Sequence, residues 1–214
     1  MRLFIGILCS EDLKKEIKAC VSDITYKGLR WLLPSQWHIT LIPPITAESD
    51  GIANLLQPLC RERHAFPIRF DRISLAPKPY KPRLLWVSGS ISEPLIAVRD
   101  QIYSRLAEKS VLSLPAAMRH RPLLPHITVA RMLNQYKQAR HSRFQDKGNQ
   151  VEKRHSIGIP SEVHHGRDNL AEARPAIDIP IDIQTSLTGF SIIESHLSEK
   201  GSFYTEIKRF ECLP

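Results

Sequence analysis

The residues of this sequence best suited to chemistry are two histidines, each followed two positions later by a threonine. His38 and Thr40 lie in the stretch WHIT, and His126 and Thr128 lie in the stretch PHIT. A single triplet of this kind is expected by chance in a chain of this length. Two copies in matching surroundings indicate a shared role, so these four residues form the candidate catalytic set.

Each triplet lies in a predicted strand, at 37–42 and at 126–132. Successive side chains of a strand point to opposite faces, so each histidine shares one face with its threonine while the isoleucine between them points into a core. If the two halves of the chain are related by a pseudo-twofold axis, both His-Thr pairs converge on one cleft.

Two convergent imidazoles suit in-line displacement at phosphorus without a metal. One can take a proton from an attacking water while the other protonates the leaving oxygen, since the ordinary imidazole pKa of about 6.5 permits both forms near neutral pH. The threonine hydroxyls can donate hydrogen bonds to the phosphate. Arg131 adds positive charge at the same end, although its odd spacing from Thr128 directs it to the opposite face unless the strand bends there.

Other kinds of site find little support in the sequence. His38 and His126 have no Cys, Asp or His neighbour at the spacing of metal ligands, and the adjacent His164 and His165 lie in a polar segment. The chain has no P-loop, no GxGxxG and no GxSxG, and its four cysteines form no CxxC pair. We expect neither a metal nor a cofactor.

The elements that must position the histidines repeat in outline. Each half is predicted to contain a helix, the strand with its His-Thr pair, an intervening segment and two further strands, and a last strand closes the chain. The first strand is expected to stop at Pro43-Pro44, and a helix is expected from about 48 to 63. The intervening segment of the second half is rich in charge and poor in apolar residues, so 138–176 is predicted to be a flexible or partly disordered insertion. Two roles remain possible for this insertion, a solvated loop without function or an arm that contacts RNA.

The net charge of the chain limits the classes of partner that it is expected to bind. The net charge is +8 and the pI is about 9.5, which favours nucleic acid, acidic membrane surfaces or phosphorylated metabolites, or serves solubility alone. The apolar run near the N-terminus is too short for a confident signal peptide, and no stretch approaches the roughly 20 apolar residues of a membrane span. We expect a cytoplasmic protein that does not bind membranes.

Several motifs together resemble a known family. They are the opening RLFIGIL, then PSQWHITL, KPRLLWVSG, LPHITVAR and the ending ES-x-L with G-x-x-Y-x-x-I-K-R-F. This combination resembles the two-histidine phosphoesterase superfamily, and within it the bacterial RNA 2′,3′-cyclic phosphodiesterases, also called 2′-5′ RNA ligases. The resemblance runs from residue 2 to about 210. Two segments depart from the pattern, IPPITAES after the first motif and LAPKPYKP before the strand that contains RLLWVSG, and they affect the expected substrate preference more than the chemistry.

The resemblance implies an α+β fold, with two antiparallel sheets facing a central cleft, helices outside and one His-Thr motif in each lobe. Residues 1–214 would then form one bilobal domain. It also implies metal-independent opening of a ribose 2′,3′-cyclic phosphate to a 2′-phosphate, with reversible 2′-5′ ligation as a weaker activity. His38, Thr40, His126 and Thr128 match its catalytic positions, and Arg131 matches its phosphate-binding residue.

The sequence leaves several alternatives open. The roles of the two histidines are not fixed by it, and our working assignment is His126 as base and His38 as acid. The expected partner is RNA with a 2′,3′-cyclic phosphate end, with tRNA fragments among the candidates, and the protein is expected to be a monomer. A noncatalytic RNA-end-binding protein and a phosphodiesterase for a small cyclic-phosphate nucleotide are the alternatives.

Overall fold

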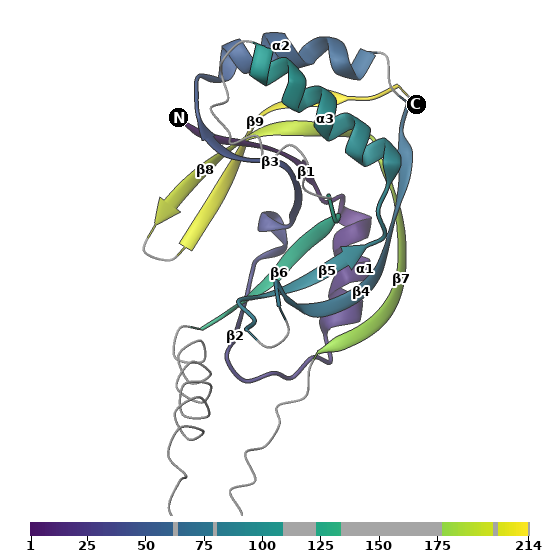
Figure 1. Ribbon diagram of the computed structural model, residues 1–214. Helices are drawn as coiled ribbons and strands as arrows, with labels where there is room; N and C mark the ends of the chain where they lie inside the picture. The colour runs from purple at the N-terminus through teal and green to yellow at the C-terminus, as the bar shows by residue number, and fades with distance from the viewer. Residues whose placement is uncertain (62–63, 79–80, 109–122, 134–176, 199–200, 214) are drawn as a thin grey trace, which may run out of the picture.

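The computed structural model describes residues 1–61, 64–78, 81–108, 123–133, 177–198 and 201–213, so the predicted insertion at 138–176 lies outside the described part. In this part of the chain three helices are interspersed among nine strands (Figure 1). Their bounds are β1 (Arg2–Leu8), α1 (Glu11–Val21), β2 (Leu29–Trp31), β3 (His38–Thr46), α2 (Ser49–Arg61), β4 (Phe66–Ala76), β5 (Leu84–Gly89), α3 (Glu93–Glu108), β6 (His126–Met132), β7 (Asp178–Leu187), β8 (Gly189–Ser198) and β9 (Gly201–Glu211), with a short 3-10 turn at Pro34–Gln36 before β3.

The strands form one antiparallel, strongly curved sheet in the order β7-β4-β5-β6-β3-β1-β8-β9, with β2 beside β6 (Figure 1). The prediction of an α+β fold built on antiparallel strands is confirmed, but the prediction of two separate sheets is wrong. The two groups of four strands are continuous because β3 and β6 pair, through Ile39 and Ile127 alone. The predicted cleft therefore lies over the pairing of β3 with β6, within one sheet.

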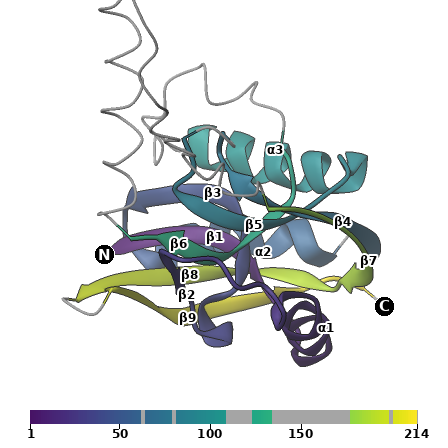
Figure 2. The ribbon, with the colours of Figure 1, turned by 90° about the horizontal axis from the view of Figure 1, so that it is seen from below.

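Each strand that carries a His-Thr pair follows a strand and a helix. The order is β1, α1, β2, β3 in one case and β5, α3, β6 in the other, and β1 pairs with β3 as β5 pairs with β6. Ser10 begins α1 by accepting a hydrogen bond from the Leu13 amide at 3.2 Å. Helices α2 and α3 lie side by side, whereas α1 lies apart from them (Figures 1 and 2).

Strand β3 continues through Pro43 and Pro44 to Thr46, so the prediction that it stops at these prolines is wrong. Proline lacks the amide hydrogen that a regular ladder requires. The pairing with β1 is irregular over this stretch, passing from Ile5 opposite Ile42 to Leu3 opposite Ile45. The missing donors therefore coincide with positions where the ladder is already interrupted.

The isoleucines between each His and Thr belong to the core, as expected, since Ile39 is 1% exposed and Ile127 is 0% exposed. Each of them thus fixes its strand and leaves the polar pair on the opposite face. Among the described residues no helix is both long enough and apolar enough to span a membrane.

Candidate active site

The pairing of β3 with β6 brings the two His-Thr motifs next to each other. Ile39 lies opposite Ile127 in an antiparallel register, so His38 lies across from Thr128 and Thr40 lies across from His126. All four polar side chains are half-buried. The sheet therefore forms a compact square of two imidazoles and two hydroxyls.

A cavity of about 430 Å³ opens beside this square. His38, Thr40, Thr128 and Arg131 are among the residues that line it. His126 is not among the lining residues, but its positive form is close enough to act electrostatically on His38. The other lining residues are Arg2, Phe4, Leu32, Gln36, Pro44, Ser195, Leu197, Ser202 and Tyr204.

The two imidazoles are held in the same way. Nδ1 of His38 is 2.7 Å from the backbone oxygen of Gln36, and Nδ1 of His126 is 2.8 Å from the backbone oxygen of Leu124. A carbonyl oxygen can only accept, so Nδ1 carries the hydrogen in both rings. Nε2 of each histidine is then the atom available to accept or donate a proton.

Burial lowers the pKa of both histidines below the ordinary value of 6.5 because it disfavours the charged form, although the hydrogen bonds to the carbonyls oppose this. For His38, the positive charges of His126 and Arg131 lower the pKa further. Simultaneous protonation of both rings is therefore disfavoured. A pair that shares one proton is the state in which one histidine can act as base while the other acts as acid.

Aromatic side chains fix the planes of both rings. Trp86 of β5 stacks on His126 with ring centroids 3.9 Å apart. Phe4 of β1 and Tyr204 of β9 lie 4.8 and 5.0 Å from His38, centroid to centroid. Sequence reasoning did not single out these rings as site residues, although all three stand within the motifs that carry the family resemblance.

A bulge in β6 brings Arg131 to the cavity. Trp86 lies opposite Thr128 and Leu85 lies opposite Ala130, so Val129 is an extra residue on β6. Val129 and Ala130 are consecutive yet both 0% exposed, which shows that the alternation of faces is reset between them. Arg131 therefore points to the same face as Thr128, and the bend that the sequence analysis required is present.

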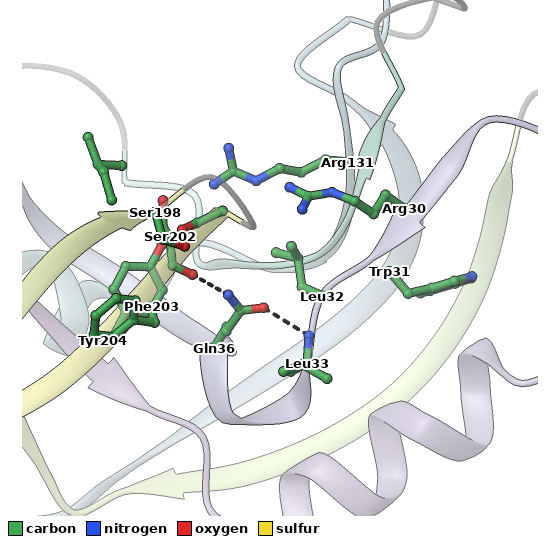
Figure 3. Close-up of a pocket in the computed structure, with 12 residues that line it drawn as sticks. Arg30, Trp31, Leu32, Leu33, Gln36, Arg131, Ser198, Ser202, Phe203 and Tyr204 are labelled. Atoms are coloured by element: carbon green, nitrogen blue, oxygen red, sulfur yellow. Dashed lines mark hydrogen bonds between the residues drawn. The ribbon is translucent and has the colours of Figure 1, made fainter.

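Gln36 ties the approach to β3 to the hairpin of β8 and β9. Its side-chain amide donates to the backbone oxygen of Ser202 and its side-chain oxygen accepts from the amide of Leu33 at 2.9 Å (Figure 3). The backbone oxygen of the same residue holds His38. No sequence signal identified Gln36, because its role depends on a strand far along the chain.

Within the described part of the chain, no three or more His, Cys, Asp or Glu side chains are grouped so that they could hold a metal ion. The nearby thiol of Cys9 is buried, and this burial raises its pKa to about 12. That thiol is therefore not a nucleophile near neutral pH.

Comparison with known families identifies the chain. The model of the 2′-5′ RNA ligase superfamily matches residues 11–154, a span that contains both His-Thr motifs. The chain belongs to the 2′-5′ RNA ligase superfamily. The resemblance to two-histidine phosphoesterases is thereby confirmed.

Two relatives of this superfamily member are named RNA 2′,3′-cyclic phosphodiesterase. The protein of Archaeoglobus fulgidus is 22% identical over 134 residues, which cover 62% of this chain and 73% of the relative. The protein of Aquifex aeolicus is 23% identical over 137 residues, which cover 62% of this chain and 71% of the relative.

Solved structures share the fold of this superfamily member. The protein TT0787 of Thermus thermophilus superimposes with a TM-score of 0.67 at 19% identity, with 99% of this chain and 97% of that chain covered. LigT of Escherichia coli, in its complex with 3′-AMP, gives a TM-score of 0.62 at 19% identity, with 100% and 98% covered.

Proposed function

We propose that this protein is a metal-independent RNA 2′,3′-cyclic phosphodiesterase, which hydrolyses a terminal ribose 2′,3′-cyclic phosphate to a 2′-phosphate. The observation that carries the proposal is the pair of imidazoles beside one cavity, each with Nδ1 tied to a backbone carbonyl and Nε2 left for the substrate. The names of the two curated relatives agree with this activity.

The reaction needs two proton transfers. Water attacks the phosphorus and gives its proton to one imidazole, while the bond from phosphorus to the 3′-oxygen breaks and that oxygen takes a proton from the other imidazole. The products are a 2′-phosphate and a free 3′-hydroxyl. A 5′-hydroxyl of a second RNA in place of water would give a 2′-5′ bond, which is the proposed ligase activity.

We assign the base role to His126 and the acid role to His38. His38 lines the cavity together with Phe4 and Tyr204, where a nucleoside and its departing 3′-oxygen would lie. His126 lies outside that lining, and its hydrogen bond to Leu124 is more exposed to solvent, so an attacking water reaches it readily. The pKa of both histidines is lowered, so the division of roles rests on their positions relative to the cavity.

The remaining predicted site residues stabilise charge in this proposal. Thr40 and Thr128 line the cavity from opposite strands and can donate hydrogen bonds to the two non-bridging phosphate oxygens. Arg131 supplies a guanidinium that offsets the charge developing on phosphorus. Both proton transfers and the stabilisation of charge thus come from protein side chains, so the mechanism requires no metal.

We propose further that the two halves are a pseudo-twofold duplication. Two features of the strands support it. β3 has its own bulge, since Gly6 lies opposite Thr40 and Ile5 lies opposite Ile42, and the extra residue, Leu41, follows its threonine as Val129 follows Thr128. In both motifs the backbone oxygen two residues before the histidine holds Nδ1.

The proposal is tested by incubating the purified protein, with EDTA present, with a short RNA that ends in a 2′,3′-cyclic phosphate. The terminal phosphate of the product is then located by ³¹P NMR. The expected product is a 2′-phosphate formed at the same rate with and without the chelator. RNA that binds but stays unchanged would contradict the proposal and favour a noncatalytic RNA-end-binding protein, and loss of the rate in EDTA would contradict metal independence.

A further inference from the structure

Trp86 of β5 lies against the ring of His126 and outside the cavity of the site. It lines neither that cavity nor a second one, of about 410 Å³, which shares Gln36 and Arg131 with the first. The indole and the imidazole are stacked, with ring centroids 3.9 Å apart and an angle of 28° between the planes. The proposed reaction assigns no step to this side chain, so any effect of Trp86 on the chemistry passes through His126.

The strand pairing explains why the indole reaches His126. Trp86 lies directly opposite Thr128 of β6, so it is a diagonal neighbour of His126, within reach of an aromatic side chain. Leu85 and Val87, on either side of it, are both 0% exposed and anchor β5 in the core. The side chain between them is therefore directed to the face that carries the His-Thr pair.

The other histidine is held differently. Phe4 and Tyr204 contact the ring of His38, but their planes are inclined to it by 45° and 80°, so neither is stacked on it. The hydrogen bond from Nδ1 to a backbone carbonyl is part-buried at His38 and exposed at His126. Because water competes for an exposed hydrogen bond, this contact alone holds the ring of His126 less firmly. Trp86 supplies the second constraint.

A stacked indole also acts on the charge of its neighbour. The face of an aromatic ring is negative, and a cation within about 6 Å of the ring centroid is attracted to it, most strongly when the ring is that of tryptophan. The imidazole of His126 lies well within this distance. His126 becomes positive only when it holds a second proton, so the stack with Trp86 favours the protonated form of the ring.

The indole carries a cost that a purely apolar side chain would avoid. Nε1 of Trp86 is buried and has no hydrogen-bond partner among the described residues, and a buried N–H that makes no hydrogen bond is destabilising. Phenylalanine or leucine would cover the ring of His126 without that donor. Local features that lower stability are typical of functional positions, so this cost favours a role for Trp86 beyond packing.

We propose that Trp86 is the positioning residue of His126, which fixes the plane of the imidazole for proton transfer and stabilises the positive charge that the ring acquires there. The inference rests on the proposed function, since it takes His126 to accept the proton of the attacking water. The O–H bond of that water breaks as an N–H bond forms at Nε2 of His126, and the indole itself neither gives nor takes a proton. The stack therefore assists the proton transfer without contacting the phosphate.

The test compares Trp86→Leu with Trp86→Phe on an RNA that ends in a 2′,3′-cyclic phosphate. Trp86→Leu is expected to lower kcat roughly 10-fold and to leave KM within about 2-fold of the wild type, because the stack acts on proton transfer and not on binding. Trp86→Phe keeps a ring face and should lie within about 3-fold of the wild-type kcat. The control is Trp31→Leu, which removes a tryptophan of β2 that is 41% exposed and should match the wild type.

A second measurement separates stacking from burial. NMR titration of the ring protons gives the pKa of His126 in the wild type and in Trp86→Leu, and follows His38 at the same time, because the charges of the two rings interact. If the indole only excludes water from His126, its removal raises the pKa of His126. If the stack favours the protonated ring, its removal lowers that pKa. We expect the pKa of His126 to fall.

Three results would overturn the inference: an unchanged kcat in Trp86→Leu, equal losses of kcat in Trp86→Leu and Trp86→Phe, or a rise in the pKa of His126. The titration needs no turnover, so it decides whether the stack favours the protonated ring even where the wild type is inactive on cyclic-phosphate RNA and the proposed function fails. Should Trp86→Leu not fold, Trp86→Met fills much the same space without a ring and replaces it in both measurements.

Discussion

Strands β3 and β6 hold their histidines identically but surround them differently. In both strands the extra residue of a one-residue bulge directly follows the threonine, and in both Nδ1 of the histidine is hydrogen-bonded to the carbonyl two residues earlier. The third residue after the threonine, however, is Pro43 on β3 and Arg131 on β6. The shared features are those that place and orient an imidazole, and the difference is that, of the two strands with a His-Thr pair, only β6 contributes an arginine to the cavity.

The strands that pair with β6 and with β3 also place different residues beside the two motifs. Opposite Thr128 stands Trp86, whose ring stacks on His126, whereas opposite Thr40 stands Gly6. A Cβ at Gly6 would lie 2.7 Å from the backbone oxygen of Ile39, so no larger residue fits beside the first motif. Phe4 and Tyr204 contact His38 instead. One histidine is packed under a ring and the other faces an open cavity, which matches a division into base and acid.

The largest expected effect tests whether both copies are needed. His38→Ala and His126→Ala should each lower kcat on a cyclic-phosphate RNA roughly 100- to 10,000-fold, the usual contribution of one acid or base, with the melting temperature retained. His64→Ala, at an exposed position away from the cavities, serves as the control and should turn over at the wild-type rate. Most of the activity surviving in either variant would show that one motif suffices.

The next effect tests whether the threonines are equivalent. Thr40→Val and Thr128→Val each remove one hydroxyl from the phosphate while keeping the shape of the side chain, so each should lower kcat roughly 10- to 100-fold. Because the register places the two threonines at matching positions, the two losses of kcat should agree within a factor of about three. A large loss in one variant with no loss in the other would break the equivalence of the two strands.

A smaller effect probes the asymmetry of charge. Arg131 is among the groups that lower the pKa of His38, but not of His126. Arg131→Gln should therefore raise the pKa of His38 and leave that of His126 in place, as followed by NMR titration of the ring protons. Equal shifts at both histidines would contradict an effect of Arg131 on His38 alone.

The smallest effect concerns stability. Both histidines have a lower pKa in the folded protein than the ordinary 6.5, so the unfolded chain binds more protons between these values. Their contribution to the free energy of unfolding is full above pH 6.5 and is lost as the pH falls from there through the folded-state pKa. The melting temperature of His38→Ala should consequently depend less on pH over this range than that of the wild type. An equally steep dependence would argue against burial as the cause of the shift.

The sequence predicted which polar side chains share one face of each strand, but it did not predict the residues that surround them. Alternation along a strand places His38 with Thr40 and His126 with Thr128, because it depends on local geometry alone. The side of Arg131 depended on a bulge at Val129, which strand pairing creates. Gln36 and Tyr204 reach the site through contacts between distant strands, so no local pattern predicts them.

The same reasoning explains the errors in the fold. Pro43 and Pro44 predict the end of a strand from local sequence, but the irregular pairing of β3 with β1 accommodates them. The two groups of strands were expected to form separate sheets, since nothing in either motif specifies the pairing of Ile39 with Ile127 that joins them. Both outcomes depend on tertiary pairing and not on propensity.

The most direct test of the central claim, that the two histidines act as an acid and a base on one cyclic phosphate, uses a substrate in which sulfur replaces the 3′-bridging oxygen. A thiolate leaves without protonation, so the acid becomes dispensable while the base does not. We predict that His38→Ala regains a rate within about 10-fold of the wild type on this substrate, whereas His126→Ala stays impaired by at least roughly 100-fold. Equal impairment of both variants on the sulfur substrate would contradict the division of roles, and recovery of His126→Ala alone would reverse it.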